Sequence, residues 1–235
     1  MSTTPDQAWA AVADVNGWMT RGQSDALFAA AAACPPGGRI VEIGSFQGRS
    51  TIVLALAAPA DAEIVAIDPH AGNDRGPQEI DGYADQAADD HTTFLANLAA
   101  AGVADRVRHV RQFSDAALGD VPGAIDVLYI DGAHRYAPAR ADIVAWGNRV
   151  SPGGTLLIHD SFSSIGVTLA ILRELAFGSK FRYVGRSRSL TIYRAEPVGR
   201  LANAARQFAQ LPWFAKNVAL KVAISAKLSK AEWPY

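Results

Sequence analysis

The chain has 235 residues, of which 49% are apolar and 19% are charged. This composition is that of an ordinary globular protein, and the length suits one catalytic domain with a three-layer core. The formal net charge is −1, which excludes an overall positive field that would attract nucleic acid. Charge is unevenly distributed, because residues 197–235 carry +5 and residues 1–196 carry −6.

Cysteine content and hydropathy bear on where the protein works. Cys34 is the single cysteine, which excludes an intramolecular disulfide and fits a reducing compartment. The first residues lack the basic and apolar regions of a secretory signal, and no run of 18 apolar residues is present. We therefore expect a cytoplasmic protein.

Apolar runs of strand length alternate with segments of helical period, which is typical of βαβ units and a parallel sheet covered on both faces. An alanine-rich helix is predicted at 24–33. Parallel strands are then predicted at 39–43, 63–67, 107–111, 125–130 and 155–159, with helices at 49–58, 89–101, 114–119 and 137–149. A helix at 164–177 leads to β-prone runs at 181–185 and 190–193, which predict an antiparallel hairpin.

Two segments fall outside this alternation. The irregular stretch 69–90 contains three glycines and several acids, which is typical of a lid or a disordered loop. Residues 200–230 predict two helices broken near Pro212, the second rich in lysine. This tail is expected to pack on its own domain or on a second subunit, with a peripheral membrane contact as the alternative. We divide the chain into a helical segment 1–38, an α/β domain 39–196 and a basic helical tail 197–235.

The sequence VEIGSFQGRST, residues 41–51, joins the first predicted strand to a helix through a glycine-containing turn. Gly44 and Gly48 allow positive φ and a close approach to a ligand, and free N–H groups at the helix start favour a carboxylate. Glu42 is placed to hold an ammonium group or to order water beside it. Asp68 ends the next strand, 24 residues after Gly44, where a carboxylate can bond a ribose diol. Both features predict an adenosine cofactor and leave NAD and S-adenosylmethionine open.

Five segments between residues 39 and 162 are more specific when they are taken together. They read VEIGSFQGRST, VAIDPH, FLANLAAAGVADRVRHVRQFSDAA, VLYIDGAHRYAPARADIVAW and SPGGTLLIHDSF. In their order and spacing they resemble the class I S-adenosylmethionine-dependent methyltransferases, within them a bacterial family related to macrocin-type sugar O-methyltransferases, and more distantly catechol O-methyltransferase. The resemblance implies an α/β, three-layer Rossmann-like methyltransferase fold whose mostly parallel seven-stranded sheet ends in an antiparallel hairpin. A dinucleotide-binding sheet instead continues in parallel.

The resemblance also implies a cofactor site for S-adenosylmethionine. Ser50 belongs to this site, Asp68 takes the ribose, and Asp131 faces the reacting methyl group. Four residues would surround the methionine moiety: Glu42, Gly44, Ser45 and Gly48. Phe113 and Ser114 would lie beside the adenine.

A candidate reaction centre follows two apolar strands that should be neighbours. Asp131 and Asp160 end these strands, so their carboxylates can meet at the edge of the sheet where such folds bind ligands. Two carboxylates form half of an oxygen-ligand site for Mg²⁺, which would lower the pKa of a bound hydroxyl. Catechol-type enzymes have Asn after the second Asp, whereas this chain has Ser161; the alternative to a metal site is that Asp160 caps the next helix or bonds His159.

His134 lies three residues after Asp131 and is our first choice of base for an alcohol proton. His159 directly precedes Asp160, and strand alternation directs its side chain to another face, where it would be a packing residue. His134 and Asp131 are therefore the predicted catalytic pair.

The leading hypothesis is O-methylation of a hydroxyl on a sugar or another small natural product, with Mg²⁺ assistance left open and no nucleic acid partner. One alternative is an NAD-dependent oxidoreductase or epimerase, although the glycine turn lacks GxGxxG spacing and no Tyr-x-x-x-Lys pair follows the central strands. Another is a non-catalytic scaffold with the same fold, which would use the basic tail to bind a partner.

Overall fold

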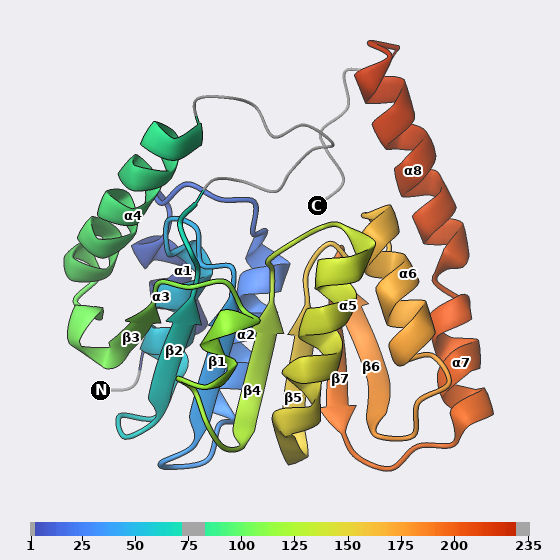
Figure 1. Ribbon diagram of the computed structural model, residues 1–235, viewed down its shortest axis with the longest axis horizontal. Coiled ribbons are helices and arrows are strands. Elements are labelled where there is room, and N and C mark those ends of the chain that lie inside the picture. Colours follow the sequence, from blue (N-terminus) through green and yellow to red (C-terminus); the bar gives the residue numbers. More distant parts are fainter. Residues whose placement is uncertain (1–2, 72–82, 229–235) are drawn as a thin grey trace.

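The computed structural model describes residues 3–71 and 83–228 (Figure 1). In this part of the chain seven strands form one sheet in the order β3-β2-β1-β4-β5-β7-β6. The strands are β1 (Arg39–Ile43), β2 (Glu63–Ile67), β3 (Val107–Val110), β4 (Ile125–Ile130), β5 (Val150–Ile158), β6 (Phe181–Ser187) and β7 (Leu190–Ala195). Strands β1 to β5 are parallel, whereas β7 lies antiparallel between β5 and β6. The predicted mostly parallel sheet with an antiparallel hairpin at its end is confirmed.

Helices cover both faces of this sheet (Figure 1). The helices are α1 (Pro5–Ala11), α2 (Arg21–Ala32), α3 (Arg49–Ala57), α4 (Tyr83–Ala100), α5 (Tyr136–Ala145), α6 (Ile165–Glu174), α7 (Arg200–Phe208) and α8 (Leu211–Ser225). Side chains of α2, α3 and α4 share one buried core, and those of α5 and α6 share the other. Successive strand residues alternate between the two cores, as Ile40 and Val41 of β1 do. Burial on both faces explains why these strands are continuous apolar runs.

The observed elements differ from the predicted ones mainly at their ends. The predicted helix 137–149 ends at Ala145 and continues as a short 3-10 turn, Gly147–Arg149, which reverses the chain into β5. The predicted helix 114–119 is only the 3-10 turn Ala116–Leu118. Helix α4 begins at Tyr83, inside the predicted loop 69–90, and residues 72–82 of that loop lie outside the described residues.

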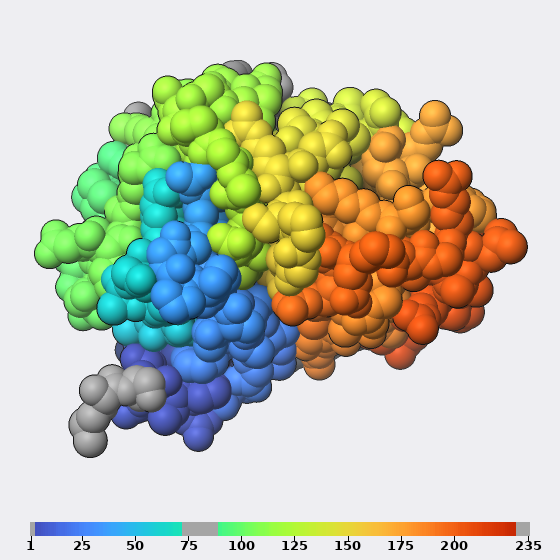
Figure 2. All heavy atoms as spheres, turned by 90° about the horizontal axis from the view of Figure 1, so that it is seen from below, coloured from blue at the N-terminus to red at the C-terminus, as the bar shows by residue number. Residues whose placement is uncertain are grey.

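The tail forms the two expected helices, and the break near Pro212 falls at residues 209–210. Pro212 lies in the first turn of α8, where a missing N–H costs no hydrogen bond. Trp213 and Phe214 of α8 pack against the α5–α6 core, so the tail docks on its own domain. Figure 2 shows this C-terminal segment, orange to red, at one end of the molecule, away from the blue N-terminal helices.

Helix α8 then continues past the edge of the sheet, at the top right of Figure 1. No helix in the described ranges combines the length and the apolar character needed to cross a membrane.

Candidate active site

A cavity of about 440 Å³ lies at the edge of the sheet where β1, β2 and β4 end. Seven of the predicted cofactor residues line it: Gly44, Ser45, Ser50, Asp68, Phe113, Ser114 and Asp131. Glu42 and Gly48 are not among the residues that line it. The carboxyl ends of parallel strands are the usual ligand-binding edge of such sheets, so the cavity is where the topology places a cofactor.

The glycine turn is shaped by close contacts between strand ends. Gly44 has φ +86°, and a Cβ atom there would lie 2.3 Å from the backbone oxygen of Asp131. Only glycine therefore allows β1 and β4 to approach at this point. Asp68 fixes the turn from the other side, because its Oδ2 accepts hydrogen bonds of 2.9 Å from the backbone N–H groups of both Ser45 and Phe46. Asp68 thus has a role in holding the loop that the sequence did not indicate.

Glu42 lies beneath the cavity, completely buried. Its two carboxyl oxygens accept hydrogen bonds from the hydroxyls of Ser50 and Thr51 at the start of α3. Burial raises the pKa of Glu42 to about 8; the two hydroxyls oppose this effect, and the negative charges of Asp131 and Asp68 add to it. Glu42 is therefore an uncharged acid at neutral pH that ties β1 to α3.

The reaction centre contains two aspartates and two histidines. Asp131 follows β4, and its Oδ2 accepts a 2.9 Å hydrogen bond from the Tyr129 hydroxyl. Asp160 follows β5 by two residues, and its Oδ2 lies 2.8 Å from His134 Nε2. His159 lies between the carboxylates, with its Nδ1 3.2 Å from Asp131 Oδ1 and 3.5 Å from Asp160 Oδ2. Asp131 and Asp160 lie together at the edge of the sheet, as their strand order predicted, and His134 joins them through Asp160.

His159 differs from the sequence expectation, which placed its side chain on another face. The backbone N–H of His159 donates to the Ile130 backbone oxygen at 2.9 Å, so the β4–β5 ladder reaches His159, whereas Asp160 adopts a left-handed φ of +53°. The alternation therefore ends at Asp160, whose carboxylate lies beside His159 instead of on the opposite face. Burial opposes a positive charge on His159, but the charges and hydrogen bonds of Asp131 and Asp160 outweigh it and raise its pKa to about 10. The two carboxylates therefore favour the protonated form of His159.

Asp160 is held in its charged form. Burial alone would raise the pKa of its carboxyl, but hydrogen bonds from His134 and His159 hold that pKa well below its usual range. Ser161, which stands where catechol-type enzymes have Asn, is fully buried and turned away. Its hydroxyl donates to the Ile158 backbone oxygen at 2.8 Å and lies 2.7 Å from the Thr191 hydroxyl. Ser161 therefore takes no part in the centre.

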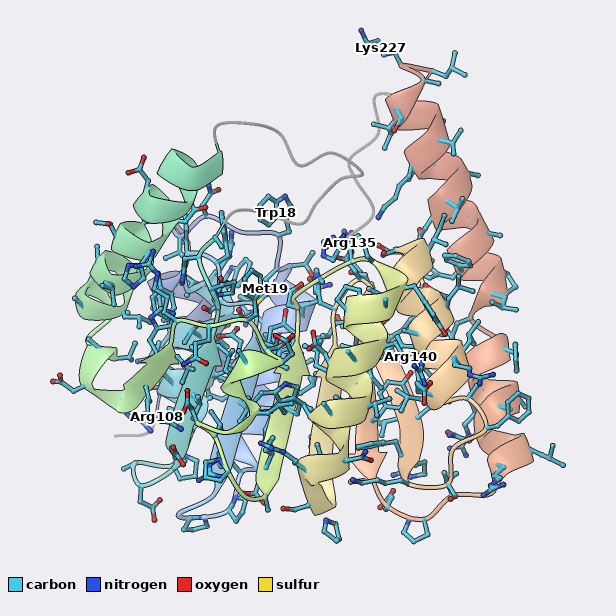
Figure 3. All side chains as sticks on the ribbon, in the orientation of Figure 1. Trp18, Met19, Arg108, Arg135, Arg140 and Lys227 are labelled. Carbon is cyan, nitrogen blue, oxygen red and sulfur yellow. The ribbon has the colours of Figure 1, made fainter. Side chains whose placement is uncertain are left out.

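A second, larger groove of about 1100 Å³ adjoins the first cavity. The two share four lining residues: Trp18, Asp131, His134 and Arg135. Figure 3 shows Trp18 and Arg135 at the upper edge of the sheet in that view, between α4 and α8. The reaction centre is thus the place where a smaller cavity and a larger groove meet.

Comparison with known proteins gives the family. A family described as methyltransferase domain matches residues 41–161, which is just over half of the chain. The chain belongs to this family. It is a class I S-adenosylmethionine-dependent methyltransferase, and family membership favours methyl transfer over the NAD-dependent alternative.

Solved structures with the same fold include three proteins described as O-methyltransferases. NovP superposes with a TM-score of 0.61 at 17% identity, covering 75% of this chain and 80% of its own. TomG from Streptomyces achromogenes, involved in tomaymycin synthesis and solved with S-adenosylmethionine, gives 0.59 at 19% identity, with 82% and 89% coverage. An O-methyltransferase from Bacillus cereus, solved with S-adenosylhomocysteine, gives 0.52 at 17% identity, with 81% and 90% coverage. These likenesses establish the fold of the methyltransferase.

The cavity of this methyltransferase suits S-adenosylmethionine. The Ser45 hydroxyl is buried and has no hydrogen-bond partner among the described residues, which marks it for a polar ligand group. The Phe113 side chain lines the cavity and is 62% exposed, which offers an aromatic face to an adenine ring. The residues present therefore fit a ligand with one polar and one aromatic end.

The same centre has donors for a divalent cation. One ligand atom each from Asp131, His134 and Asp160 lie within 4.8 Å of one another. Two carboxylates and one imidazole are a donor set that divalent metals accept. Sequence reasoning placed only the two aspartates in this set, because it treated His134 as the base.

Three residues of the site were not predicted from the sequence. Trp18 comes from the N-terminal segment, and its ring lies 5.3 Å from that of Phe46 in the glycine turn. His159 joins the two aspartates, and Lys221 reaches the larger groove from α8. Trp18 and Lys221 lie far from the motifs in sequence, and no local pattern signals their tertiary contacts.

Proposed function

We propose that this methyltransferase transfers the methyl group to a hydroxyl oxygen of a small-molecule acceptor, a sugar or another natural product. The observation that supports this best is the junction at Asp131 and His134, where the cofactor cavity opens into the larger groove. A methyl donor in the cavity and an acceptor in the groove would meet at these two side chains. The O-methyltransferase descriptions of NovP and TomG support the choice of oxygen.

S-adenosylmethionine supplies a methyl group bonded to a positively charged sulfur. With this group bound, the acceptor oxygen would form the new bond to carbon as the carbon–sulfur bond breaks, the electron pair would go to sulfur, and the hydroxyl proton would go to a base. In-line displacement requires mainly alignment and the removal of one proton. Trp18 and Asp131 border both cavities and would align the two reactants.

His134 is the base in this proposal. Its Nε2 lies 2.8 Å from Asp160 Oδ2, so the tautomer with a proton on Nε2 is favoured and Nδ1 is the atom that accepts the acceptor's proton. Asp160, whose low pKa keeps it charged, would stabilise the imidazolium that forms. General-base catalysis of this kind contributes about 10² to 10⁴ in rate.

A metal-assisted reaction is the second candidate, favoured by the spacing of Asp131, His134 and Asp160. A bound divalent ion such as Mg²⁺ would lower the pKa of the acceptor hydroxyl and orient it. His134 would then be a ligand rather than the base. Dialysis against a chelator separates the two candidates: turnover that survives supports His134 as base, and turnover that returns only with added Mg²⁺ supports the metal.

Calorimetric titration with S-adenosylhomocysteine and with NAD tests the cofactor assignment. We expect binding of the former, and tight binding of NAD alone would contradict it. Methyl transfer is then measured with a panel of hydroxylated sugars and phenols. His134→Ala and Asp131→Asn should each lower turnover by about 10² to 10⁴, and His91→Ala, which removes a histidine outside both cavities, serves as the control. Unchanged turnover in either site variant would refute its role.

A further inference from the structure

The larger groove has an apolar rim that nothing in the described chain covers. Val222 of α8 is 63% exposed, Ile165 at the start of α6 is 58% exposed, and Tyr136 of α5 is also exposed; all three line the groove. Val218 adds a partly buried apolar side chain from the same side of α8. An apolar rim around a groove that ends in a polar centre is typical of a ligand site.

Helix α8 is a fixed wall of this groove. The buried Asn217 donates a 2.9 Å hydrogen bond from its Nδ2 to the Phe162 backbone oxygen, in the turn that carries Asp160. One turn of helix later, Lys221 Nζ donates to the Ser163 hydroxyl at 3.2 Å. Ser163 in turn donates to Asp160 Oδ1 at 3.2 Å. The helix is therefore attached to the turn that positions the reaction centre, and the geometry of the groove is set by that attachment.

Besides the aspartates and histidines of the reaction centre, the charged side chains that line the groove are positive. Helix α8 contains lysines and no acidic residue between Leu211 and Ser225. Lys221 lines the groove from this helix, and Arg135 lines it from the start of α5. The Lys221 ammonium is partly buried, which lowers its pKa, while the charge of Asp160 opposes that effect. An anion bound there would interact more strongly than one in bulk water.

We propose that this groove binds the methyl acceptor as an amphipathic small molecule with an anionic group. The apolar body of the acceptor lies along Val222 and Ile165, its carboxylate, phosphate or sulfate contacts Lys221, and its reacting hydroxyl reaches His134. The proposal rests on the proposed function and names its substrate class. Lys221 is then a specificity-determining residue, and α8 is part of the acceptor site.

Two matched fluorescent probes test the site without a known acceptor. Anilinonaphthalenesulfonate carries an apolar ring system and a sulfonate, and phenylnaphthylamine is its uncharged counterpart. Each is titrated into the protein saturated with S-adenosylhomocysteine. We expect Lys221→Met to weaken sulfonate binding by about tenfold or more, and to leave the uncharged probe within about twofold. Lys221→Arg should restore the sulfonate affinity.

Lys216→Met is the matched control, because it removes the same charge from the same helix at a residue that lies over Trp213 rather than in the groove. Ser163→Ala breaks the link from Lys221 to Asp160 but keeps the lysine charge, so it should retain the preference for the sulfonate. Equal losses in the Lys216 and Lys221 variants would overturn the proposal. So would an absence of sulfonate binding, or a dimer that Val222→Asp dissociates, since a second copy would then occupy the groove.

Turnover separates this inference from the function on which it rests. Hydroxylated aromatic acids and their methyl esters are compared as acceptors, and we expect Lys221→Met to raise KM for the acids by about tenfold with little change for the esters. If acids and esters are both methylated and their KM values are the same in wild type and Lys221→Met, the role of Lys221 is refuted while methyl transfer remains supported. If the two probes bind as expected but no hydroxyl compound is methylated, O-methylation is refuted and the anion site remains supported.

Discussion

Glu42→Gln tests the conclusion that the acid beneath the glycine turn is uncharged. The ordinary pKa of Glu42 near 4.5 is raised to about 8 in the folded protein, so the folded state binds one more proton than the unfolded state between these values. Stability from this group is fully present below pH 4.5 and is lost as the pH rises through 8. At about 1.4 kcal/mol per pH unit, raising the pH from 5 to 8 lowers the free energy of unfolding by about 3.5 kcal/mol through Glu42 alone.

The glutamine variant lacks this titration. Its amide can still bond the hydroxyls of Ser50 and Thr51, since each hydroxyl both donates and accepts. Urea unfolding of both proteins from pH 5 to 8 should show the wild type losing about 3.5 kcal/mol relative to the variant, equivalent to about 10 °C in Tm for a protein of this size. Glu63→Gln is the control. Partial burial opposes the charge of Glu63, but its ion pairs with Arg39 and Arg108 outweigh burial and lower its pKa, so its stabilising effect is not lost as the pH rises.

Parallel stability curves for wild type and Glu42→Gln would refute the reasoning, because Glu42 would then titrate alike in both states. Cofactor affinity gives a second measurement. Glu42 is absent from the cavity lining, so the variant should bind S-adenosylhomocysteine within about threefold of the wild type. A much larger loss would favour the contact with the cofactor's ammonium that the sequence suggested.

Two further pairs of variants test the cavity. Gly44→Ala places a Cβ 2.3 Å from the Asp131 backbone oxygen and should lower the free energy of unfolding by about 3 to 5 kcal/mol. Gly37→Ala, at φ +67° with nothing within 4 Å of the new Cβ, should lower it by only about 1 kcal/mol, as measured by urea unfolding. Similar losses of stability in the two variants would contradict the close contact at Gly44. Phe113→Ala should weaken S-adenosylhomocysteine binding about tenfold at unchanged stability, and Phe177→Ala, a similarly exposed ring elsewhere, should have no effect in calorimetry.

Strand positions were the most predictable part of the structure. The bounds predicted for β1, β2 and β4 match the observed ones, because both faces of these strands are buried and the apolar run ends where the strand ends. The same regularity places Asp131 and Asp160 at one edge. Parallel neighbours bring their carboxyl ends together, so the meeting of these two side chains followed from the order of the strands.

Side-chain partners were less predictable, because they depend on contacts between elements. The sequence assigned Glu42 to the cofactor, but α3 supplies two hydroxyls that face it from the next layer. Strand alternation placed His159 and Asp160 on different faces, but the left-handed conformation of Asp160, which no local signal requires, brings its carboxylate beside His159. Left-handed φ also occurs at Phe46 and His70, which border the cofactor cavity, so backbone strain gathers at the edge where the chemistry is proposed.

The two cavities are lined by different parts of the chain. The family match spans residues 41–161 and contains Gly44, Asp68, Asp131 and the other motif residues of the cofactor cavity. The walls of the acceptor groove come largely from outside it, from Trp18 before the match and from α6 and α8 after it. The family match therefore contains the residues proposed for the methyl donor and for catalysis, while the groove proposed for the acceptor is lined largely by segments outside that match. Substitutions on α8 should consequently change which compounds are methylated before they change how tightly S-adenosylhomocysteine binds.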